Sequence, residues 1–171
     1  MNEVRNSLFE EAQVPQASRE LAELRQAADY APPFEIIRRR VIDDYFEGKM
    51  TIDATVVIRI GDVEENEAAR GVGVVHALDL ALRKALLKYF PFLEKVHATE
   101  TYTHASGEST EAEVMSIKKF SDGNRAWTTV AKSVNSVEAG WGSLVDGYEW
   151  YIHIYRLDKK SRSNNPRPAQ R

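Results

Sequence analysis

The segment 71-GVGVVHALDLALRK-84 decides the fold, because it marks where a strand ends and a helix begins. Gly71 and Gly73 stand one residue apart, directly before an amphipathic run. The apolar members of this run recur at helical spacing, which predicts a helix with one buried face. They are Val75, Leu78, Leu82, Ala85, Leu86 and Tyr89. Pro91 is expected to end this helix.

The glycine pair before the predicted helix could serve two purposes. A dinucleotide fingerprint needs a third small residue where His76 stands, and a phosphate loop needs Gly-Lys-Ser/Thr, which is absent. The pattern instead fits a general anion or carboxylate site, since a helix N-terminus offers free N–H groups and a partial positive charge. The alternative is that the glycines only make a tight turn. Both interpretations stay open at this point.

Three strands are predicted before this helix. Residues 34–46 and 50–61 are rich in β-branched and aromatic residues, with alternation in the second run, and a turn joins them at 47–49. A third strand, 63–70, follows the turn at Gly61. The glycine pair then leads from this strand into the helix. The order of elements is strand, strand, strand, helix.

The same order recurs further along the chain. Strands are predicted at 96–106, 110–120 and 124–133, and a helix at 136–155. At an offset of 62 residues, "ARGVGVVHALDLAL" (69–82) aligns with "AKSVNSVEAGWGSL" (131–144). We therefore predict an α+β fold of two βββα units that arose by internal duplication.

Composition outside the repeat predicts three parts. Residues 1–31 are expected to form an N-terminal helical arm or linker, with Ser18 as helix cap and Pro32 and Pro33 at its boundary. Residues 32–157 would form the folded domain. Residues 158–171 lose apolar side chains and gain Ser, Asn, Pro and basic residues, which predicts a disordered basic tail.

Bulk properties exclude several classes of protein. The 171-residue chain with 43% hydrophobic residues can build one domain with a core. Its net charge of −3 disfavours nucleic-acid binding, and no apolar run is long enough to cross a membrane. The N-terminus is acidic where a secretory signal would be basic and then apolar. The prediction is a soluble cytoplasmic protein without a nucleic-acid or membrane partner.

The sequence shows no catalytic or metal centre. None of the four histidines forms an HxH or HxxxH pair, no cysteine is present, and no GxSxG motif surrounds a serine. We therefore expect no metal, no cofactor and no catalytic residues in this chain.

The second predicted helix contains three glycines, Gly140, Gly142 and Gly147. Each glycine in a helix interior costs about 1 kcal/mol relative to alanine. We expect the close approach of another helix or chain to compensate. The aromatic residues Tyr148, Trp150, Tyr151 and Tyr155 fit either the core or an oligomer interface.

Residues 33–157 resemble the C-terminal regulatory, or allosteric dimerisation, domain of α-isopropylmalate synthase and citramalate synthase. The resemblance is carried by "ATVVIRIGD", "GVGVVHALDLALRKALLKYFP", "SDGNRAWTTVAKS" and "NSVEAGWGSLVDGYEW". In that family the loop usually reads Gly-Asn-Gly-Pro, and the second helix usually begins Asn-Ile-Ile-Glu-Ala-Ser-Trp. The family fold consists of two βββα units related by a pseudo-twofold axis and paired into a homodimer.

The resemblance implies a regulatory role in leucine or other branched-chain amino acid biosynthesis. Such domains bind the end product, leucine or isoleucine, near helix N-termini and the dimer interface, and inhibit a separate acyl-CoA-condensing catalytic domain. An amino acid needs N–H donors for its carboxylate, acceptors for its ammonium group and an apolar slot for its side chain. The ligand-binding positions that the resemblance implies are Gly71, Val72, Gly73, Val74, Ala77, Thr101, Tyr102, Ala105, Val134, Asn135 and Ala139.

Two departures from the family pattern keep alternatives open. Val72 replaces the usual asparagine of the loop, and Val74 replaces the proline favoured at a helix start. Either the ligand differs, or the domain is an assembly module that dimerises or pairs with a synthase without binding a small molecule. An enzyme that uses the duplicated sheet is a further alternative, for which no acid–base pair is visible.

Overall fold

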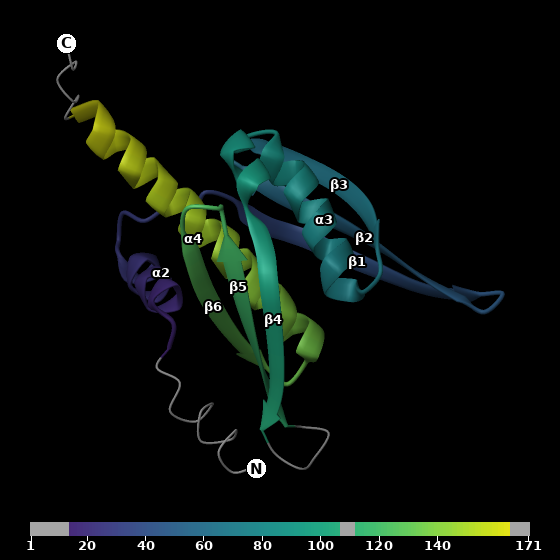
Figure 1. The fold of residues 1–171 in the computed structure, drawn as a ribbon. Helices are drawn as coiled ribbons and strands as arrows, with labels where there is room; N and C mark the ends of the chain where they lie inside the picture. The colour runs from purple at the N-terminus through teal and green to yellow at the C-terminus, as the bar shows by residue number, and fades with distance from the viewer. Residues whose placement is uncertain (1–13, 107–111, 165–171) are drawn as a thin grey trace. The chain divides into compact units, whose positions relative to one another are not determined.

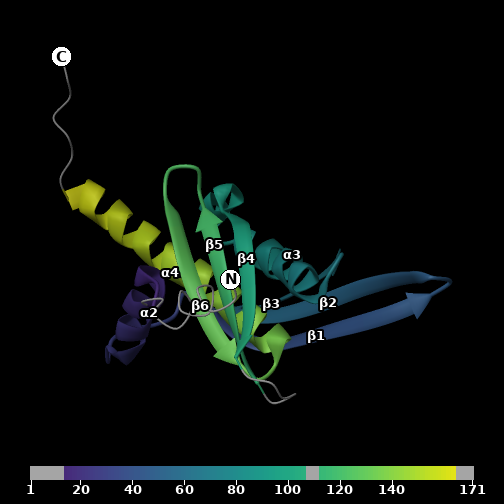
Figure 2. The same cartoon turned by 60° about the horizontal axis from the view of Figure 1, so that its bottom comes forward.

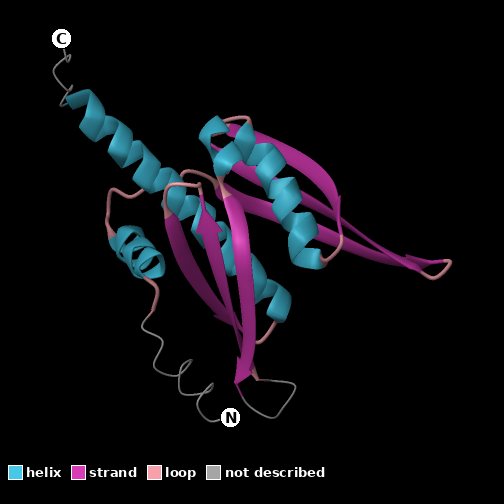
Figure 3. Ribbon diagram, in the orientation of Figure 1, coloured by secondary structure: helices cyan, strands magenta, loops and turns pink. Residues whose placement is uncertain are grey.

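The computed structural model describes residues 14–106 and 112–164 and forms two compact units. The β4–β6 unit contains His97–Gly147 and the described residues up to Tyr30, and the β1–β3 unit contains Ala31–Val96 and the described residues from Tyr148. The elements, coloured along the chain in Figure 1 and by type in Figure 3, are α2 (Gln16–Gln26), β1 (Glu35–Phe46), β2 (Lys49–Ile60), β3 (Val63–Gly71), α3 (Val74–Leu87), the 3₁₀ helix η1 (Pro91–Lys95), β4 (His97–Ser106), β5 (Glu113–Ser121), β6 (Ala126–Ser133) and α4 (Ser136–Asn164).

The β1–β3 unit is an antiparallel sheet of order β1-β2-β3 covered by α3. The β1–β2 hairpin turns through Glu47 and Gly48, both at positive φ, as a two-residue hairpin loop requires. Alternate residues of β2 face α3 and are buried, which is why this strand alternates in sequence. The core comprises Ile52, Ala54, Val56 and Ile58 from the sheet and Ala77, Leu78, Ala81, Leu82, Ala85 and Leu86 from α3.

The β4–β6 unit is a second antiparallel sheet, of order β4-β5-β6. Helix α2 contacts β6 and buries Ala17 and Leu21. Ser18 lies inside α2, and its hydroxyl accepts a hydrogen bond from the Val130 N–H at 2.9 Å. The prediction that Ser18 caps the helix is therefore wrong, since Pro15 occupies the cap position.

Two of the three glycines of α4, Gly142 and Gly147, are explained by the sheet of the same unit. A Cβ at Gly147 would lie 2.2 Å from the Phe120 ring, and one at Gly142 would lie 2.9 Å from the Ala131 Cβ. Helix backbone thus approaches strands β5 and β6 too closely for side chains at these positions. We expected another helix or chain to approach these glycines. For Gly142 and Gly147 the close neighbours are instead strands of the same unit.

The internal duplication is visible in strand register. Ile52 pairs with Gly71 in the first repeat, and the residues 62 positions later, Val114 and Ser133, pair in the second. The bulge in β1 between Ile36 and Arg38 recurs in β4 between Ala98 and Glu100, again 62 positions on. The helices begin at Val74 and Ser136, with the same offset. The predicted α+β fold of two βββα units is confirmed.

The end of the chain differs from the prediction. Helix α4 continues to Asn164 rather than ending at Tyr155. The predicted disordered tail, 158–171, is therefore helical over 158–164, and residues 165–171 lie outside the described part of the chain.

Candidate functional site

The loop before α3 contains two glycines with different roles. A Cβ at Gly71 would lie 2.5 Å from the backbone nitrogen of Ala77, so this position requires glycine for packing. Gly73 has extended backbone, and a Cβ placed there would have no neighbouring atom within 4 Å. It occupies the helix cap without supplying a side-chain hydrogen bond. The first backbone N–H groups of α3 therefore have no capping side chain.

The rest of this loop presents apolar side chains and one histidine. Val72 is 93% exposed, while Val74 is half-buried. The Val72 N–H donates to Nδ1 of His76 at 3.2 Å, which holds the loop against the first turn of α3. Ala77 is buried, and its N–H donates to the Gly73 carbonyl at 2.9 Å. This role of His76 was not predicted from the sequence.

The N-terminus of α4 is the equivalent position in the second repeat, and it is capped. Oδ1 of Asn135 accepts the N–H of Val137 at 2.8 Å and that of Glu138 at 3.3 Å. Val134 is 69% exposed, like its counterpart Val72, and Ala139 is buried, like Ala77. The asparagine uses its side-chain oxygen on its own helix, so α4 offers a ligand fewer free donors than α3 does.

The three β4 positions implied by the resemblance do not share one face. Direct pairing places Thr101 opposite Lys118 and Tyr102 opposite Ile117. Because neighbouring residues of a strand alternate, Thr101 and Ala105 lie on the face of Lys118, and Tyr102 lies on the other. Lys118 is 4% exposed, and its Nζ donates to Thr101 Oγ1 at 2.9 Å.

Tyr102 belongs to a surface group on the opposite face. Its hydroxyl donates to Glu100, whose carboxylate also accepts a hydrogen bond from Lys119 Nζ at 2.9 Å. Lys119 lies 5.4 Å from the centre of the Tyr102 ring. These contacts lower the pKa of Glu100, first through the tyrosine and then through the lysine.

Sequence reasoning missed Lys118, although its position carried a signal. Ser116, Lys118 and Phe120 occupy alternate positions of β5 and all are buried, so the lysine stands in the buried phase of the strand. A buried lysine is rare unless its ammonium group is paired. The alternation along β5 was readable in the sequence, but the burial of Lys118 under α4 was not.

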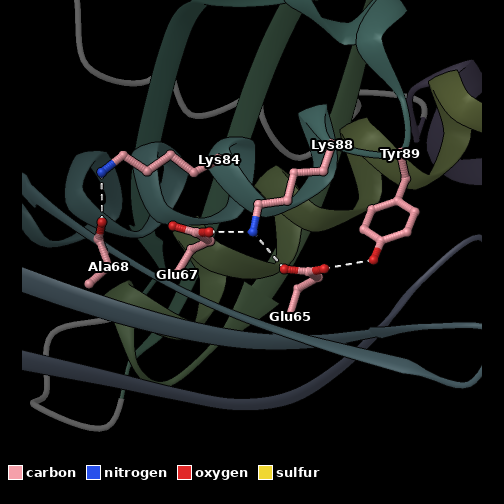
Figure 4. Close-up of polar contacts among 6 residues, drawn as sticks. All are labelled: Glu65, Glu67, Ala68, Lys84, Lys88 and Tyr89. Atoms are coloured by element: carbon pink, nitrogen blue, oxygen red, sulfur yellow. Dashed lines mark hydrogen bonds and ion pairs between the residues drawn. The ribbon is translucent and has the colours of Figure 1, made fainter.

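A polar cluster joins β3 to α3 in the β1–β3 unit (Figure 4). Lys88 Nζ lies 2.6 Å from both Glu65 Oε2 and Glu67 Oε1, and the Tyr89 hydroxyl donates to Glu65 at 2.6 Å. Lys84 donates to the Ala68 carbonyl at 2.8 Å. The hydrogen bonds from Lys88, and then from Tyr89, lower the pKa of Glu65. The cluster is made of internal partners and fixes the helix on the strand.

A second polar group lies in the core of the same unit. Tyr148 is fully buried, and its hydroxyl donates to Asp79 at 2.7 Å. Arg83 donates to the Tyr148 oxygen at 3.3 Å and to the Val96 carbonyl. Burial, followed by the charge of Asp79, raises the pKa of Tyr148. This arrangement keeps the phenol protonated and attaches α4 to α3.

The described residues contain no group of three or more His, Cys, Asp or Glu side chains placed to hold a metal ion. Among the described helices, none combines the length and apolar character needed to span a membrane.

Comparison with known proteins places the chain in a family. Residues 20–152 match the LeuA allosteric (dimerisation) domain. The chain belongs to this family. The match covers both repeats, α2 in part and α4 as far as Ile152, and so includes every candidate position named above.

Curated relatives of this LeuA-type domain are named (R)-citramalate synthase. The Geobacter sulfurreducens protein is 34% identical over 142 residues, which cover 81% of this chain and 27% of the relative. The Sulfolobus acidocaldarius protein is 40% identical over 101 residues, 58% of this chain and 19% of the relative. The Aquifex aeolicus protein is 38% identical over 111 residues, which cover 64% of this chain and 20% of the relative. The chain thus spans about a quarter or less of these relatives.

Proposed function

We propose that this domain is the allosteric part of an acyl-CoA-condensing synthase and binds a branched-chain amino acid, leucine or isoleucine, for feedback control. In this proposal the domain forms a homodimer, carries no catalytic residues itself and acts on a catalytic synthase domain or subunit. Membership of an allosteric dimerisation family and similarity to proteins named (R)-citramalate synthase support it.

The observation that carries the ligand proposal is the uncapped start of α3. A natural cap residue there would satisfy the first N–H groups of the helix, as Asn135 does in α4. Gly73 leaves those groups and the positive end of the helix dipole available for a carboxylate. The open space around Gly73 allows a ligand to approach the backbone.

The adjacent apolar surface supports a branched side chain as the other half of the ligand. Val72 is the most exposed large hydrophobic residue in the described part of the chain. Covering it with an aliphatic group would remove apolar surface from water, at roughly 25 cal/mol per Å². A carboxylate donor site beside an aliphatic surface matches an amino acid better than it matches a phosphate.

A second candidate function is assembly without a small-molecule ligand. Val72 and Val74 supply no polar contact to orient an amino acid, and an exposed valine also suits a protein interface. In this alternative the domain dimerises, or pairs with a synthase, and its helix N-terminus is bonded to water.

Calorimetry and thermal shift with leucine, isoleucine and valine test the proposal, with glycine as the control that lacks a side chain. We expect heat and a raised Tm for at least one branched ligand and neither for glycine. Gly73→Asp should abolish the response, since its carboxylate would cap α3 and repel the ligand carboxylate. Asn124→Asp is the matched control, because it adds the same charge at an exposed turn residue outside the candidate positions.

Absence of heat and of a thermal shift at millimolar ligand would favour the assembly alternative. An unchanged response in Gly73→Asp would contradict the assignment of the carboxylate to α3. The absence of catalysis is tested separately, by measuring acyl-CoA condensation with pyruvate and with 2-oxoisovalerate using the isolated chain. Turnover there would overturn a purely regulatory role.

A further inference from the structure

The loop before α3 has little packing to hold it in place. Strand β3 ends at Gly71 and α3 begins at Val74, so Val72 and Gly73 alone connect them (Figure 2). Val72 is 93% exposed, and a Cβ at Gly73 would have no neighbouring atom within 4 Å. Since packing does not fix these two residues, the path of the loop depends on hydrogen bonds.

The equivalent loop of the second repeat is held by hydrogen bonds from its own side chains. Ser133 Oγ accepts the N–H of Asn135 at 3.1 Å. Asn135 Oδ1 accepts the N–H groups of Val137 and Glu138, at 2.8 and 3.3 Å. These bonds fix the backbone on both sides of the helix start and use donors that begin α4.

The first repeat can form none of these bonds, because it has glycine at both acceptor positions. At the offset of 62 residues, Gly71 stands in place of Ser133 and Gly73 in place of Asn135. Neither glycine offers a side-chain acceptor. A side chain that fixes this loop must therefore reach it from another element.

One side chain reaches the loop from the helix. His76 is the third residue of α3, and its Nδ1 accepts the Val72 N–H at 3.2 Å. In the described part of the chain, no other side chain makes a hydrogen bond to residues 71–73. A side chain at this helix position folds back in a similar way in a capping box. Because Nδ1 accepts, it carries no proton, and the neutral ring holds its proton on Nε2.

We propose that His76 is the positioning residue of this loop: its Nδ1 holds Val72 and Gly73 on the path that leaves the first N–H groups of α3 open to a ligand. This role rests on the proposed function for the ligand, whereas the hydrogen bond itself does not. The apparent affinity of a ligand falls with the fraction of molecules whose site is in the competent state. Loss of the Nδ1 acceptor should therefore raise the dissociation constant.

Three substitutions distinguish the acceptor from the rest of the ring. Asparagine carries Oδ1 on Cγ, as histidine carries Nδ1, so His76→Asn should retain the bond. His76→Gln moves the acceptor one bond further from the backbone, and His76→Ala removes it. His97→Ala is the matched control, since His97 is an exposed histidine of β4, outside the loop.

Hydrogen exchange of the Val72 amide, followed by NMR in the whole chain without ligand, tests the bond. Exchange should be about two- to tenfold faster in His76→Gln and His76→Ala, the range expected for the loss of one hydrogen bond. His76→Asn and His97→Ala should exchange at close to the wild-type rate. The ¹⁵N shifts of the His76 ring, measured at about pH 8, should show the proton on Nε2. Equal exchange in all variants, or a neutral ring with its proton on Nδ1, would overturn the hydrogen bond.

Calorimetry with leucine and isoleucine tests the positioning role. The dissociation constant should rise about two- to tenfold in His76→Gln and His76→Ala, and stay near the wild-type value in His76→Asn. An equal loss of affinity in His76→Asn and His76→Ala would overturn the assignment to Nδ1.

The outcomes separate this inference from the proposed function. If the wild type binds and His76→Ala binds equally well, the amino-acid ligand stands and the positioning role is overturned. If the wild type binds neither amino acid while Val72 exchange follows the expected series, the proposed ligand is overturned, and with it the role of His76 in binding.

Discussion

The two βββα repeats share their register but differ in the chemistry between sheet and helix. The middle strand of the first repeat buries Ala54, Val56 and Ile58, and the equivalent residues of the second are Ser116, Lys118 and Phe120. On its middle strand, the helix of the first repeat therefore packs against aliphatic side chains, and the helix of the second packs against polar side chains and a large ring. The same backbone frame accommodates both.

The helices have adapted to these faces at equivalent positions. Ala81 and Ala85 of α3 correspond to Ser143 and Gly147 of α4. The Ser143 carbonyl accepts the Thr129 hydroxyl at 2.6 Å, and the Gly147 carbonyl accepts the Trp127 indole N–H at 3.1 Å.

The third strand contacts the helix through side chains in both repeats, but with the opposite direction of donation. In the second repeat Trp127 and Thr129 of β6 donate to the helix backbone. In the first repeat Glu65 and Glu67, at the matching positions of β3, accept from Lys88. Duplication preserved the place of the contact and changed its chemistry.

The largest predicted effect comes from giving α4 the residue of α3. Gly147→Ala should lower the free energy of unfolding by about 2 kcal/mol, because overpacking against Phe120 exceeds the roughly 1 kcal/mol gained in helix propensity. Urea unfolding measures the loss. In the Phe120→Ile background, which supplies the residue found at position 58, the same change should cost nothing. An equal cost in both backgrounds would contradict the contact as its cause.

Changing the residue at the helix cap should have a smaller effect on stability. The change should destabilise the second repeat and stabilise the first. Asn135→Ala removes the acceptor for two N–H groups of α4 and should cost about 1 kcal/mol. Gly73→Asn should stabilise α3 by a few tenths of a kcal/mol, since the site has room and suitable backbone. Thermal unfolding without ligand checks both. A destabilised Gly73→Asn protein would show that the loop cannot accept a cap.

The smallest predicted effect concerns pH and the carboxylates present only in the first repeat. The pKa of Glu65 is lowered by hydrogen bonds from Lys88 and Tyr89, so the folded state binds its proton less readily than the unfolded state. Its stabilising contribution is present above the unfolded pKa and is lost as pH falls through the lower, folded pKa. Glu65→Gln should therefore flatten the acid side of the stability curve. Glu64→Gln is the control, and an equal flattening there would contradict a specific role for Glu65.

Sequence reasoning recovered the fold because its signals were periodic. The alternation in β2 and the apolar stripe of α3 report burial directly, and the 62-residue offset reports the repeat. The end of α4 was missed because residues 158–164 are polar and carry no such stripe, although they form helix. Ser18 was misassigned because a serine inside a helix and one at its cap look alike in sequence.

The candidate positions were only partly readable from sequence. Gly71 and Gly73 look equivalent in the sequence, yet one is required by the Ala77 backbone and the other faces open space. Lys118 and the β3–α3 carboxylate cluster depend on contacts between segments far apart in the chain, which no local pattern reports. The role of His76 likewise depends on the backbone path of the loop.

The repeated bulge restricts how this protein can change by insertion or deletion. Bulge, register and helix start all keep the offset of 62 residues, so no residue has been gained or lost between them in one repeat without the other. A one-residue change in a strand would exchange its two faces. Substitution, rather than change of length, was therefore the route by which the two halves diverged.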